Sequence, residues 1–551
     1  MDRFWVKQYP PGTPADIDPS EYGSLKELIE TSCEKYAARP AFTLMGHAIS
    51  YAELGLLSGR FAAWLQAHGI RKGDRLAVML PNVLQYPVVM FGALRAGITV
   101  VNVNPLYTAP ELEHQLRDSG ASVLVVLENF ACVAQQALPS TSVRHVIVTG
   151  VGDLLGFPQG PLVNFVLRRV QRKVPAWSIP EARTLGDVLK SSDDKPEPVD
   201  VRREDLAFLQ YTGGTTGVSK GAMLTHGNLI ANVLQARAWF SQVAIQDITY
   251  TCALPLYHIF SLTANCILFS SIGGHGIMVP NPRDFAGFVK LLRKYPPRFF
   301  MGVNTLFNAL MNTPGFAELD FTRLVATVGG GMAVQRAVAE RWKQVTGCVI
   351  TQGWGLTETS PAVCVNPLVG VEFTGAVGLP VPSTEVTIRD DAGKELPIGE
   401  TGEICARGPQ VMRGYWQRPD ETAKVMLEGG WLRTGDIGHM DERGYVFIDD
   451  RKKDMIIVSG FKVFPNEVED VIARMPGVAE VAAVAQPDER SGEVVAAYIV
   501  KKDPALTAEA VIEHCAKSLT AYKVPRVVYF KSDLPKTNVG KILRRALREG
   551  H

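Results

Sequence analysis

Short apolar runs recur along most of this chain, and stretches with helical periodicity separate them. Leu76–Leu80, Val123–Leu127 and Val146–Val148 are such runs, and the segment around Val88–Leu94 between the first two is apolar on several sides. Apolar runs without polar alternation are typical of strands that are buried on both faces, as in sheets covered by helices on both sides. The pattern therefore predicts an α/β fold with a large, multi-layered N-terminal domain.

The pattern changes near Asp449–Lys453, and a shorter, self-contained unit follows. It reads as a helix over 466–474, strands over 478–484 and 494–500, a helix over 508–518, a strand over 526–530 and a basic helix from Lys541. A chain of 551 residues exceeds one ordinary domain, and about 100 residues suffice for a second. We predict a large domain over 1–452 and a small, mobile α+β domain over 453–551.

The bulk composition excludes several classes of protein. The net charge of +1 gives no reason to expect a nucleic-acid partner. The 8 cysteines lie apart from one another, without the CxxC spacing of zinc sites, which favours reduced thiols in a cytoplasmic protein. No signal peptide is visible at the start. Between Asp247 and Arg283 there is no charged residue, but the prolines, glycines and histidines there indicate a strand, a core helix and a second strand rather than a membrane span.

A stretch rich in glycine and threonine interrupts the alternation. It follows the apolar run Leu206–Leu209 and precedes a helical pattern over 225–235. Backbone N–H groups, hydroxyls and one cation cluster there, as in loops that hold a nucleotide phosphate between a strand and a helix. The order around Lys220 differs from a Walker A loop. The alternative is a loop without a ligand. The residues are Tyr211, Thr212, Gly213, Gly214, Thr215, Thr216, Gly217, Val218, Ser219, Lys220, Gly221 and Ala222.

This loop resembles the signature of the adenylate-forming superfamily, which includes acyl-CoA synthetases, luciferases and the adenylation domains of peptide synthetases. Other segments that resemble superfamily motifs follow in the same order, and together they cover nearly the whole chain. They are 254–258, 329–331, 353–359, 430–436, 450–454 with 459–462, and 535–541. Segment 429–453, the opening Phe4-Trp5 with Tyr9-Pro10, and the insert 163–166 are most similar to bacterial long-chain fatty acyl-CoA synthetases.

The resemblance implies a nucleotide site. Loop 211–222 would contact the β- and γ-phosphates of ATP. Glu358, with Thr212, would hold Mg²⁺, which prefers hard oxygen ligands; the alternative for Glu358 is an acid that favours a helix N-terminus. Asp436 would accept the ribose hydroxyls, with Arg451 beside it, and the alternative is an Asx turn. The segments expected to lie against adenine and the acyl group are Gly329, Gly330 and Gly331, followed by Gly353, Trp354, Gly355, Leu356 and Thr357.

The resemblance also implies moving parts. Lys541 would bridge the acyl carboxylate and the α-phosphate from the small domain. His258 would lie near the carboxylate and the thiol entry, against the alternative of a core histidine. Lys453 would be the hinge, and a second orientation would bring Gly460 and Lys462 to CoA. Without the resemblance, Lys541 would be interpreted as a surface residue. We expect Arg544, Arg545 and Arg548 to form a solvated basic helix face.

The implied activity is a ligase that joins a fatty acid to CoA through an acyl-adenylate, with ATP and CoA as co-substrates. Apolar segments 259–262 and 303–307 are candidates for the acid pocket, and since each buried CH₂ contributes about 0.8 kcal/mol, a long tunnel favours long chains. Medium-chain or aryl acid–CoA ligases, a non-enzymatic acyl- or nucleotide-binding protein, a P-loop NTPase and a peptide synthetase module are the alternatives. The intact Lys541, Glu358 and Asp436 disfavour mere binding.

Segment 162–174 is amphipathic at the helical period. Leu162, Val166, Val170 and Val174 share a side with Val163 and Leu167, and Arg168, Arg169, Arg172 and Lys173 lie mainly on the other. This pattern is typical of helices that lie on anionic lipid, and equally of an ordinary surface helix. We therefore expect a cytoplasmic protein with a peripheral contact to the inner face of the membrane. The oligomeric state stays open, with a homodimer among the states allowed.

Overall fold

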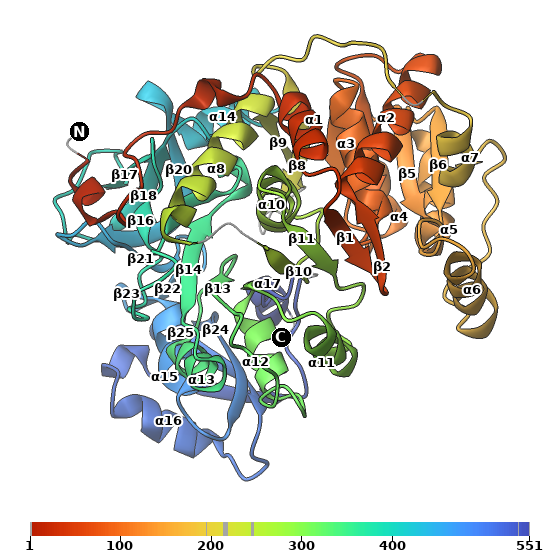
Figure 1. Cartoon of the computed structure of the whole chain (residues 1–551). Coiled ribbons are helices and arrows are strands. Elements are labelled where there is room, and N and C mark those ends of the chain that lie inside the picture. Colours follow the sequence, from red (N-terminus) through yellow and green to blue (C-terminus); the bar gives the residue numbers. More distant parts are fainter. Residues whose placement is uncertain (1–2, 194, 213–218, 244–246, 538, 550–551) are drawn as a thin grey trace.

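The structure is a computed structural model that describes residues 3–193, 195–212, 219–243, 247–537 and 539–549 (Figure 1). Within these residues the strands form four sheets, two of which make up most of the N-terminal part. The C-terminal sheet and its helices form a separate, smaller layer at the lower left of Figure 1. The predicted α/β class, with a large N-terminal and a smaller α+β C-terminal domain, is confirmed.

The first sheet has the strand order β7-β6-β5-β3-β4-β8-β9. Its bounds are β3 Arg75–Met79, β4 Thr99–Asn102, β5 Val123–Leu127, β6 His145–Thr149, β7 Arg183–Thr184, β8 Leu206–Thr212 and β9 Lys220–Thr225. Alternate residues of β3 face opposite cores: Leu76 and Val78 join one hydrophobic cluster, Ala77 and Met79 the other. Both faces are therefore covered, as the uninterrupted apolar runs predict.

The second sheet has the order β16-β15-β14-β13-β12-β10-β11-β1-β2. The bounds are β1 Pro40–Leu44, β2 His47–Ser50, β10 Thr249–Cys252, β11 His275–Met278, β12 Phe299–Gly302, β13 Ala326–Gly329, β14 Ile350–Gly355, β15 Ala362–Val365 and β16 Leu379–Pro380. Between β10 and β11 the chain is helical over α9 Ile259–Ser261, η7 Leu262–Leu268 and α10 Phe269–Ser271. This confirms the strand–helix–strand prediction, and among the described residues no helix is long and apolar enough to span a bilayer.

The third sheet, β17-β18-β20-β19 with β21 on β20, leads to the C-terminal unit. Its strands are β17 Glu385–Arg389, β18 Gly402–Arg407, β19 Met426–Leu427, β20 Trp431–Met440 and β21 Val446–Arg451. The C-terminal sheet comprises β22 Ile456–Val458, β23 Phe461–Val463, β24 Val478–Asp488, β25 Gly492–Lys501 and β26 Val527–Lys531. The predicted boundary at 452/453 falls in the connection between β21 and β22.

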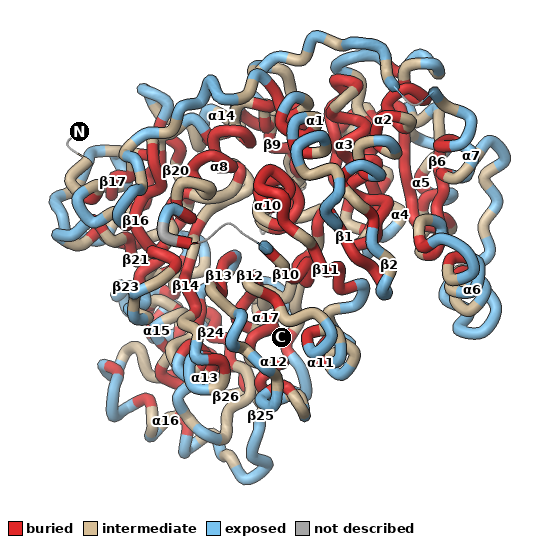
Figure 2. Tube along the Cα trace, in the orientation of Figure 1, coloured by how far each residue is buried: buried red, intermediate tan, exposed pale blue. Residues whose placement is uncertain are grey.

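Helices cover both faces of the large sheets, and in the small sheet α15 and α16 cover one face and α17, Arg544–Arg548, packs on the other. Figure 2 shows the buried strands enclosed by helices whose outer faces are exposed. The longer helices are α1 Leu25–Lys35, α2 Tyr51–Ala67, α3 Gln85–Arg95, α4 Ala109–Ser119, α5 Ala131–Ala137, α7 Leu185–Lys190, α8 His226–Ala238, α11 Phe285–Lys294, α12 Asn304–Met311, α13 Arg336–Thr346, α14 Pro419–Val425, α15 Pro465–Ala473 and α16 Ala508–Ala516. Ten of the eleven residues of α3 are buried, which explains why the sequence there is apolar on several sides.

The expected strand–loop–helix arrangement around the glycine-rich loop is wrong. β8 and β9 pair antiparallel, with Thr212 opposite Lys220, so the loop is the tip of a hairpin. Helix α8 begins only after β9, with the Thr225 side chain accepting a hydrogen bond from the N–H of Asn228. Residues 213–218 lie outside the described residues. The phosphate-binding prediction therefore depends on backbone donors and Lys220, with no helix N-terminus directly behind the loop.

The amphipathic helix expected over 162–174 is shorter and is rotated. It comprises α6 Gln159–Phe165 and a π-helical turn, η5 Val166–Val170. Leu162 and Val170 are exposed as predicted, whereas Val163, Val166, Leu167 and Val174 are half-buried against the protein. Arg168 is also not part of a free basic face, because its Nε lies 2.7 Å from Oε2 of the buried Glu128.

The prediction that Arg544, Arg545 and Arg548 form one solvated basic face is wrong for Arg544. On α17 (Arg544–Arg548), the Arg544 side chain is 15% exposed and contacts Asp450 and Glu469 at 2.9 and 2.8 Å. Arg548 pairs with Asp454, and only Arg545 is an exposed residue, paired within the helix with Glu549. The sequence alone could not place these acids beside Arg544 because they lie 75 and 94 residues away.

Candidate active site

Lys541 reaches from the C-terminal unit into the large domain. Its loop is fixed at two points: the Thr305 hydroxyl donates to the carbonyl of Gly540 at 3.0 Å, and the N–H of Thr537 donates to the carbonyl of Lys541 at 2.7 Å. A Cβ added to Gly331 would lie 3.4 Å from Cε of Lys541, and Gly331 has a φ of +78°. A side chain at Gly331 would therefore be strained and would press on the lysine stem.

The charges around Lys541 have both signs. Burial is the main cause that lowers its pKa to about 8, and the cations Arg451 and Lys453 act in the same direction, whereas Asp436 and Glu358 oppose them. An ammonium group in this setting stabilises incoming negative charge strongly, because little water screens it. The predicted catalytic lysine, the predicted ribose-binding acid and the predicted metal ligand thus lie in one electrostatic environment.

Asp436 is almost fully buried and both of its oxygens are held. The indole Nε1 of Trp354 donates to Oδ2 at 2.8 Å, and Nε of Arg451 lies 2.8 Å from Oδ1. Strand pairing enforces the second contact, since Asp436 of β20 lies opposite Arg451 of β21. The sequence-predicted pairing of Asp436 and Arg451 is present, while the role of Trp354 as a donor is additional to the predicted stacking on adenine.

Glu358 lies in a short 3₁₀ turn, η8 Thr357–Thr359, rather than at the start of an α-helix. The Tyr415 hydroxyl donates to its Oε1 at 2.6 Å. Burial and the charge of Glu358 raise the pKa of Tyr415, which therefore stays a donor. This hydrogen bond orients the carboxylate toward the site, an arrangement that fits a hard cation with few protein ligands.

Lys220, at the base of the hairpin, forms an ion pair with Glu421 of α14 and lies 5.2 Å from the centre of the Tyr415 ring. Hydrogen bonds from Lys220 and then Lys424 lower the pKa of Glu421 to about 2. Glu421 and Tyr415 were not predicted from the sequence. The partners of Lys220 and Glu358 follow them by 201 and 57 residues, so no local pattern marks them.

His258 follows a loop that is held to β8, because the Gln210 side chain donates to the carbonyl of Tyr257 at 2.8 Å. Its Nδ1 accepts from the N–H of Phe260 at 3.4 Å and caps α9. Burial, and then the charge of Lys541, lower the pKa of His258 to about 3. The imidazole is therefore neutral at pH 7 and lies close enough to Lys541 to sense its charge.

Several glycines of the predicted nucleotide segments allow close backbone approach. A Cβ on Gly355 would lie 1.8 Å from the carbonyl oxygen of Pro361, and one on Gly330 would lie 3.1 Å from that of Gly353. Gly353 and Gly355 lie in β14, Leu356 and Thr357 directly follow it, and Gly329 ends β13. Gly330 thus brings segment 329–331 against segment 353–357, and a Cβ there would also lie 3.2 Å from the Phe260 ring.

The described parts of loop 211–222 are held from outside. Tyr211 donates to Oδ2 of Asp118 at 2.6 Å, and its ring packs over Gly221. Ala222 is buried and bridges to Tyr415, while Thr212 and Ser219 flank the residues that are not described. Tyr211 thus supports the hairpin.

The candidates for the acid pocket lie in different surroundings. Phe307 packs on Trp342 with ring centres 4.9 Å apart, inside an aromatic core, and Thr305 contacts the Lys541 loop.

The predicted CoA residues are not part of this cluster. Ser459 and Gly460 form the two-residue turn of the β22–β23 hairpin. Their φ angles of 50° and 84° are both positive, as a type I′ turn requires. Gly460 and Lys462 are exposed. Lys453 borders a cavity of about 280 Å³ that is also lined by Thr434, Gly435, Arg451 and Lys452. The residues that come together are Lys541, Asp436, Arg451, Trp354, Glu358, Gly331 and His258.

Sequence relatives agree with this arrangement. The AMP-binding enzyme family matches residues 29–416, and its C-terminal domain matches residues 467–541. A long-chain-fatty-acid–CoA ligase of Escherichia coli O6:H1 is 52% identical over 100% of this chain and 98% of its own length. One from Haemophilus influenzae is 49% identical over the same shares of the two chains.

Solved structures agree as well. The anthranilate CoA ligase AuaEII in complex with anthranoyl-AMP superposes with a TM-score of 0.86, at 26% identity over 97% of this chain and 99% of its own. Matching family segments, a fold shared over the full length and the motif residues gathered at one site lead to the same assignment. The chain belongs to the AMP-binding enzyme family, the adenylate-forming enzymes.

Proposed function

We propose that this protein is a long-chain fatty acid–CoA ligase. In the first step the fatty acid carboxylate attacks the α-phosphorus of ATP, and pyrophosphate leaves. In the second step the CoA thiol loses its proton and attacks the acyl carbonyl, and AMP leaves. The observation that carries the proposal is the insertion of Lys541 beside Gly331, Glu358 and Asp436. The full-length likeness to long-chain-fatty-acid–CoA ligases supports the substrate class.

The first step requires one anion to attack another. Lys541 would lie between the acyl carboxylate and the α-phosphate, and its buried ammonium group would lower their repulsion. Loop 211–222, with Lys220, would hold the departing pyrophosphate. Asp436, fixed by Trp354 and Arg451, would accept the ribose hydroxyls. Glycines 329–331 and segment 353–357 would lie against adenine and the acyl group.

Mg²⁺ fits the donors present. Glu358 and Thr212 would hold it, and the ion would supply charge neutralisation for the phosphates. The Tyr415 hydroxyl contributes by orienting the Glu358 carboxylate.

The second step needs a different set of residues. Rotation about Lys453 would withdraw Lys541 and bring the exposed turn at Gly460, with Lys462, to the site. Gly460 would let the pantetheine arm pass the backbone, and Lys462 would meet a phosphate of CoA. His258, which is neutral, would line the entry of the thiol.

The test is a panel of acids of increasing chain length. Pyrophosphate and AMP release are measured with and without CoA. We expect pyrophosphate without CoA in a single turnover, AMP and acyl-CoA with CoA, and higher kcat/KM for palmitate than for octanoate, benzoate or acetate. Preference for benzoate or octanoate would indicate the aryl or medium-chain alternative. Nucleotide binding without AMP formation would indicate a binding protein, and ADP release an NTPase.

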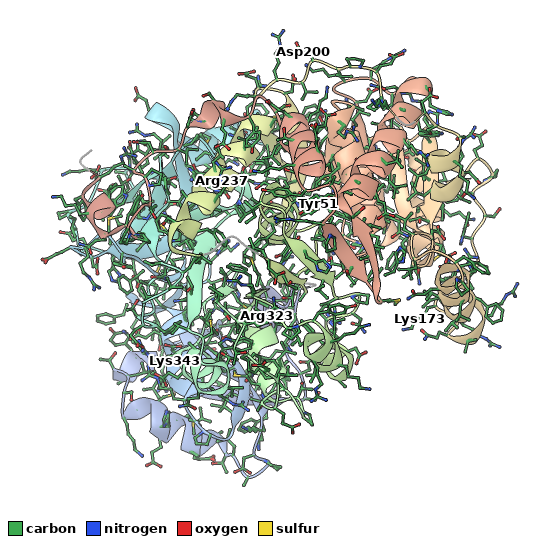
Figure 3. The ribbon with its side chains drawn as sticks, in the orientation of Figure 1. Tyr51, Lys173, Asp200, Arg237, Arg323 and Lys343 are labelled. Carbon is green, nitrogen blue, oxygen red and sulfur yellow. The ribbon has the colours of Figure 1, made fainter. Side chains whose placement is uncertain are left out.

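The proposal includes a peripheral membrane contact. An outer patch, composed of Met45, Phe157, Leu162, Phe165 and Val170, projects from α6 and its neighbours, and Phe157 is 91% exposed. The Gln159 side chain donates to the carbonyl of Met45 at 2.8 Å and joins α6 to the turn between β1 and β2. Exposed Arg169, Arg172 and Lys173 flank it at the right-hand edge of the molecule, where Figure 3 labels Lys173. Apolar side chains beside cations suit an anionic lipid surface.

Vesicles that contain phosphatidylglycerol test this contact. The variant in which Arg169, Arg172 and Lys173 all become Glu should bind about tenfold or more weakly, since each basic residue contributes about 1 kcal/mol. Arg168 is left intact because its removal would leave Glu128 buried and unpaired. A control reverses three exposed lysines elsewhere, Lys7, Lys290 and Lys502. Equal binding by both triple variants would reject the contact.

A further inference from the structure

A buried ion cluster surrounds Arg544. Its guanidinium Nε and Nη2 donate to the two oxygens of Glu469 at 3.0 and 2.8 Å, and Nη1 donates to Oδ1 of Asp450 at 2.9 Å. Nη2 also donates to Oδ1 of Asn466 at 2.6 Å. The Asp450 side chain is 1% exposed, so the contact is shielded from water. Buried pairs of this kind matter chiefly because losing one partner leaves the other charge uncompensated.

The cluster joins two parts of the chain that lie on opposite sides of the connection between β21 and β22. Asp450 belongs to β21 of the third sheet, where it lies opposite Ile437 of β20. Arg544 on α17 and Glu469 and Asn466 on α15 belong to the C-terminal unit. Asp450 also accepts the backbone N–H of Asn466 at 2.8 Å through Oδ2. One carboxylate of the large domain therefore holds two helices of the small one.

Arg544 is rigidly connected to Lys541. Lys536 and Ile542 form an antiparallel bridge on either side of the Lys541 turn, and the N–H of Leu543 donates to the carbonyl of Pro535 at 2.8 Å. The turn then meets Thr305 of α12 at Gly540. Hence the lysine loop is attached to the large domain at two places, Thr305 before Lys541 and Asp450 after it.

We infer that Arg544 is a positioning residue, whose ion pair with Asp450 across the domain boundary holds the orientation in which Lys541 enters the active site. The inference rests on the proposed two-step function, with rotation at Lys453 between the steps. Because Asp450 precedes the hinge in the chain and Arg544 follows it, rotation at Lys453 would move one relative to the other, and the pair as observed belongs to the orientation in which Lys541 enters the site. Its loss shifts the population toward other orientations.

The experiment compares the two half-reactions in the full-length chain. Acyl-adenylate formation is followed as pyrophosphate released without CoA, and thioester formation as CoA consumed from supplied palmitoyl-adenylate. We expect Arg544→Ala and Asp450→Asn to slow the first about tenfold or more, and to leave the second within about twofold. Arg545→Ala, on the same helix but exposed, is the matched control and should change neither. Asp450→Asn keeps the shape of the side chain, so it still tests the inference if Arg544→Ala fails to fold.

A second measurement does not depend on activity. Asn308 and Ala479 also touch across the boundary, where the Asn308 amide donates to the carbonyl of Ala479 at 3.1 Å. Cysteines placed at both positions should form a disulfide more slowly in the Arg544→Ala and Asp450→Asn backgrounds than in the parent. Unchanged cross-linking, or equal loss of both half-reactions, would overturn the inference. A parent chain that cross-links but forms no acyl-adenylate would instead contradict the proposed function.

Discussion

At the scale of single residues, the site shows how a buried acid is fixed by two donors of different origin. The sequence predicts Asp436 and Arg451 as neighbours, because both lie in motifs, and strand pairing places them 2.8 Å apart. It does not predict that the Trp354 indole holds the second oxygen. That contact depends on the side-chain directions of β14 and β20, which no local pattern in the sequence specifies.

The first prediction concerns Trp354. Trp354→Phe keeps an aromatic ring but removes the donor, so one oxygen of the buried Asp436 loses its partner. We expect kcat/KM for ATP to fall about fivefold to a hundredfold, from a loss of about 1–3 kcal/mol, and the preference for ATP over 2′-deoxy-ATP to shrink. Trp416→Phe is the control, because it removes a hydrogen bond from an indole N–H to the backbone carbonyl of Asp118. An unchanged nucleotide preference would show that Trp354 does not orient Asp436.

The second prediction concerns pH. The proposed role of Lys541 requires a cation, and burial lowers its pKa to about 8 in the free enzyme. Raising the pH through 8 removes the charge, so kcat/KM for acyl-adenylate formation should fall about tenfold per pH unit above that value. Lys541→Arg, whose charge persists, should lose this decline. Thioester formation should rise over the same range as the CoA thiol ionises. A first step that stays constant up to pH 10 would contradict a cationic role.

At the scale of elements, hydrophobic periodicity predicted those strands whose burial is uniform, and failed where tertiary contacts decide. The runs Leu76–Leu80 and Val123–Leu127 match β3 and β5 to within one residue. β9 was missed because Lys220–Thr225 is a short strand with a polar residue at each end, and only its pairing with β8 makes it a strand. Likewise, the π-helical turn after α6 rotates the following side chains away from the predicted face.

A contact between two helices gives the third prediction. The N–H of Leu25, at the start of α1, donates to Nδ1 of the buried His226 on α8 at 3.1 Å, and burial lowers the pKa of His226 to about 4. The unfolded value is about 6.5, so the unfolded chain binds the proton first as the pH falls. The contribution of this neutral imidazole to the free energy of unfolding is therefore fully present above pH 6.5. It declines by at most about 1.4 kcal/mol per pH unit as the pH falls to 4.

Denaturant unfolding at a series of pH values measures this effect. His226→Ala should lower the free energy of unfolding at pH 7 by about 1–3 kcal/mol and should flatten its decline between pH 6.5 and 4. His47→Ala, in the half-exposed start of β2, serves as the control. If His226→Ala has the same pH slope as the parent chain, His226 is not the group responsible.

At the scale of the whole molecule, a small domain is joined to a large one by the few residues between β21 and β22. The sequence predicted this division from the change of pattern near Asp449–Lys453, and the sheets change at the same place. The orientation of the two domains could not be predicted, since it depends on contacts such as Thr305 with Gly540. The mobility of the small domain stays a prediction, and the structure describes one arrangement of the two domains.

The fourth prediction tests the hinge. Lys453→Pro fixes φ near −65° and removes a backbone donor, so the connection loses the freedom to change direction. We expect acyl-adenylate formation to persist and thioester formation from supplied palmitoyl-adenylate to fall by about tenfold or more. Lys453→Ala, which keeps the backbone free, should change neither step by more than about threefold. Equal rates for both half-reactions in Lys453→Pro would place the hinge elsewhere.

The ion pair between Lys220 and Glu421 has a consequence for how the protein discriminates among solutes. An anion that enters the hairpin must compete with a carboxylate already in place. Inorganic phosphate carries one or two charges near pH 7 and would gain little from that exchange, whereas a nucleoside triphosphate has more charges and, in the proposed site, further contacts through its sugar and base. We therefore expect the hairpin, if it holds the phosphates of ATP as proposed, to bind inorganic phosphate weakly at concentrations at which it binds ATP.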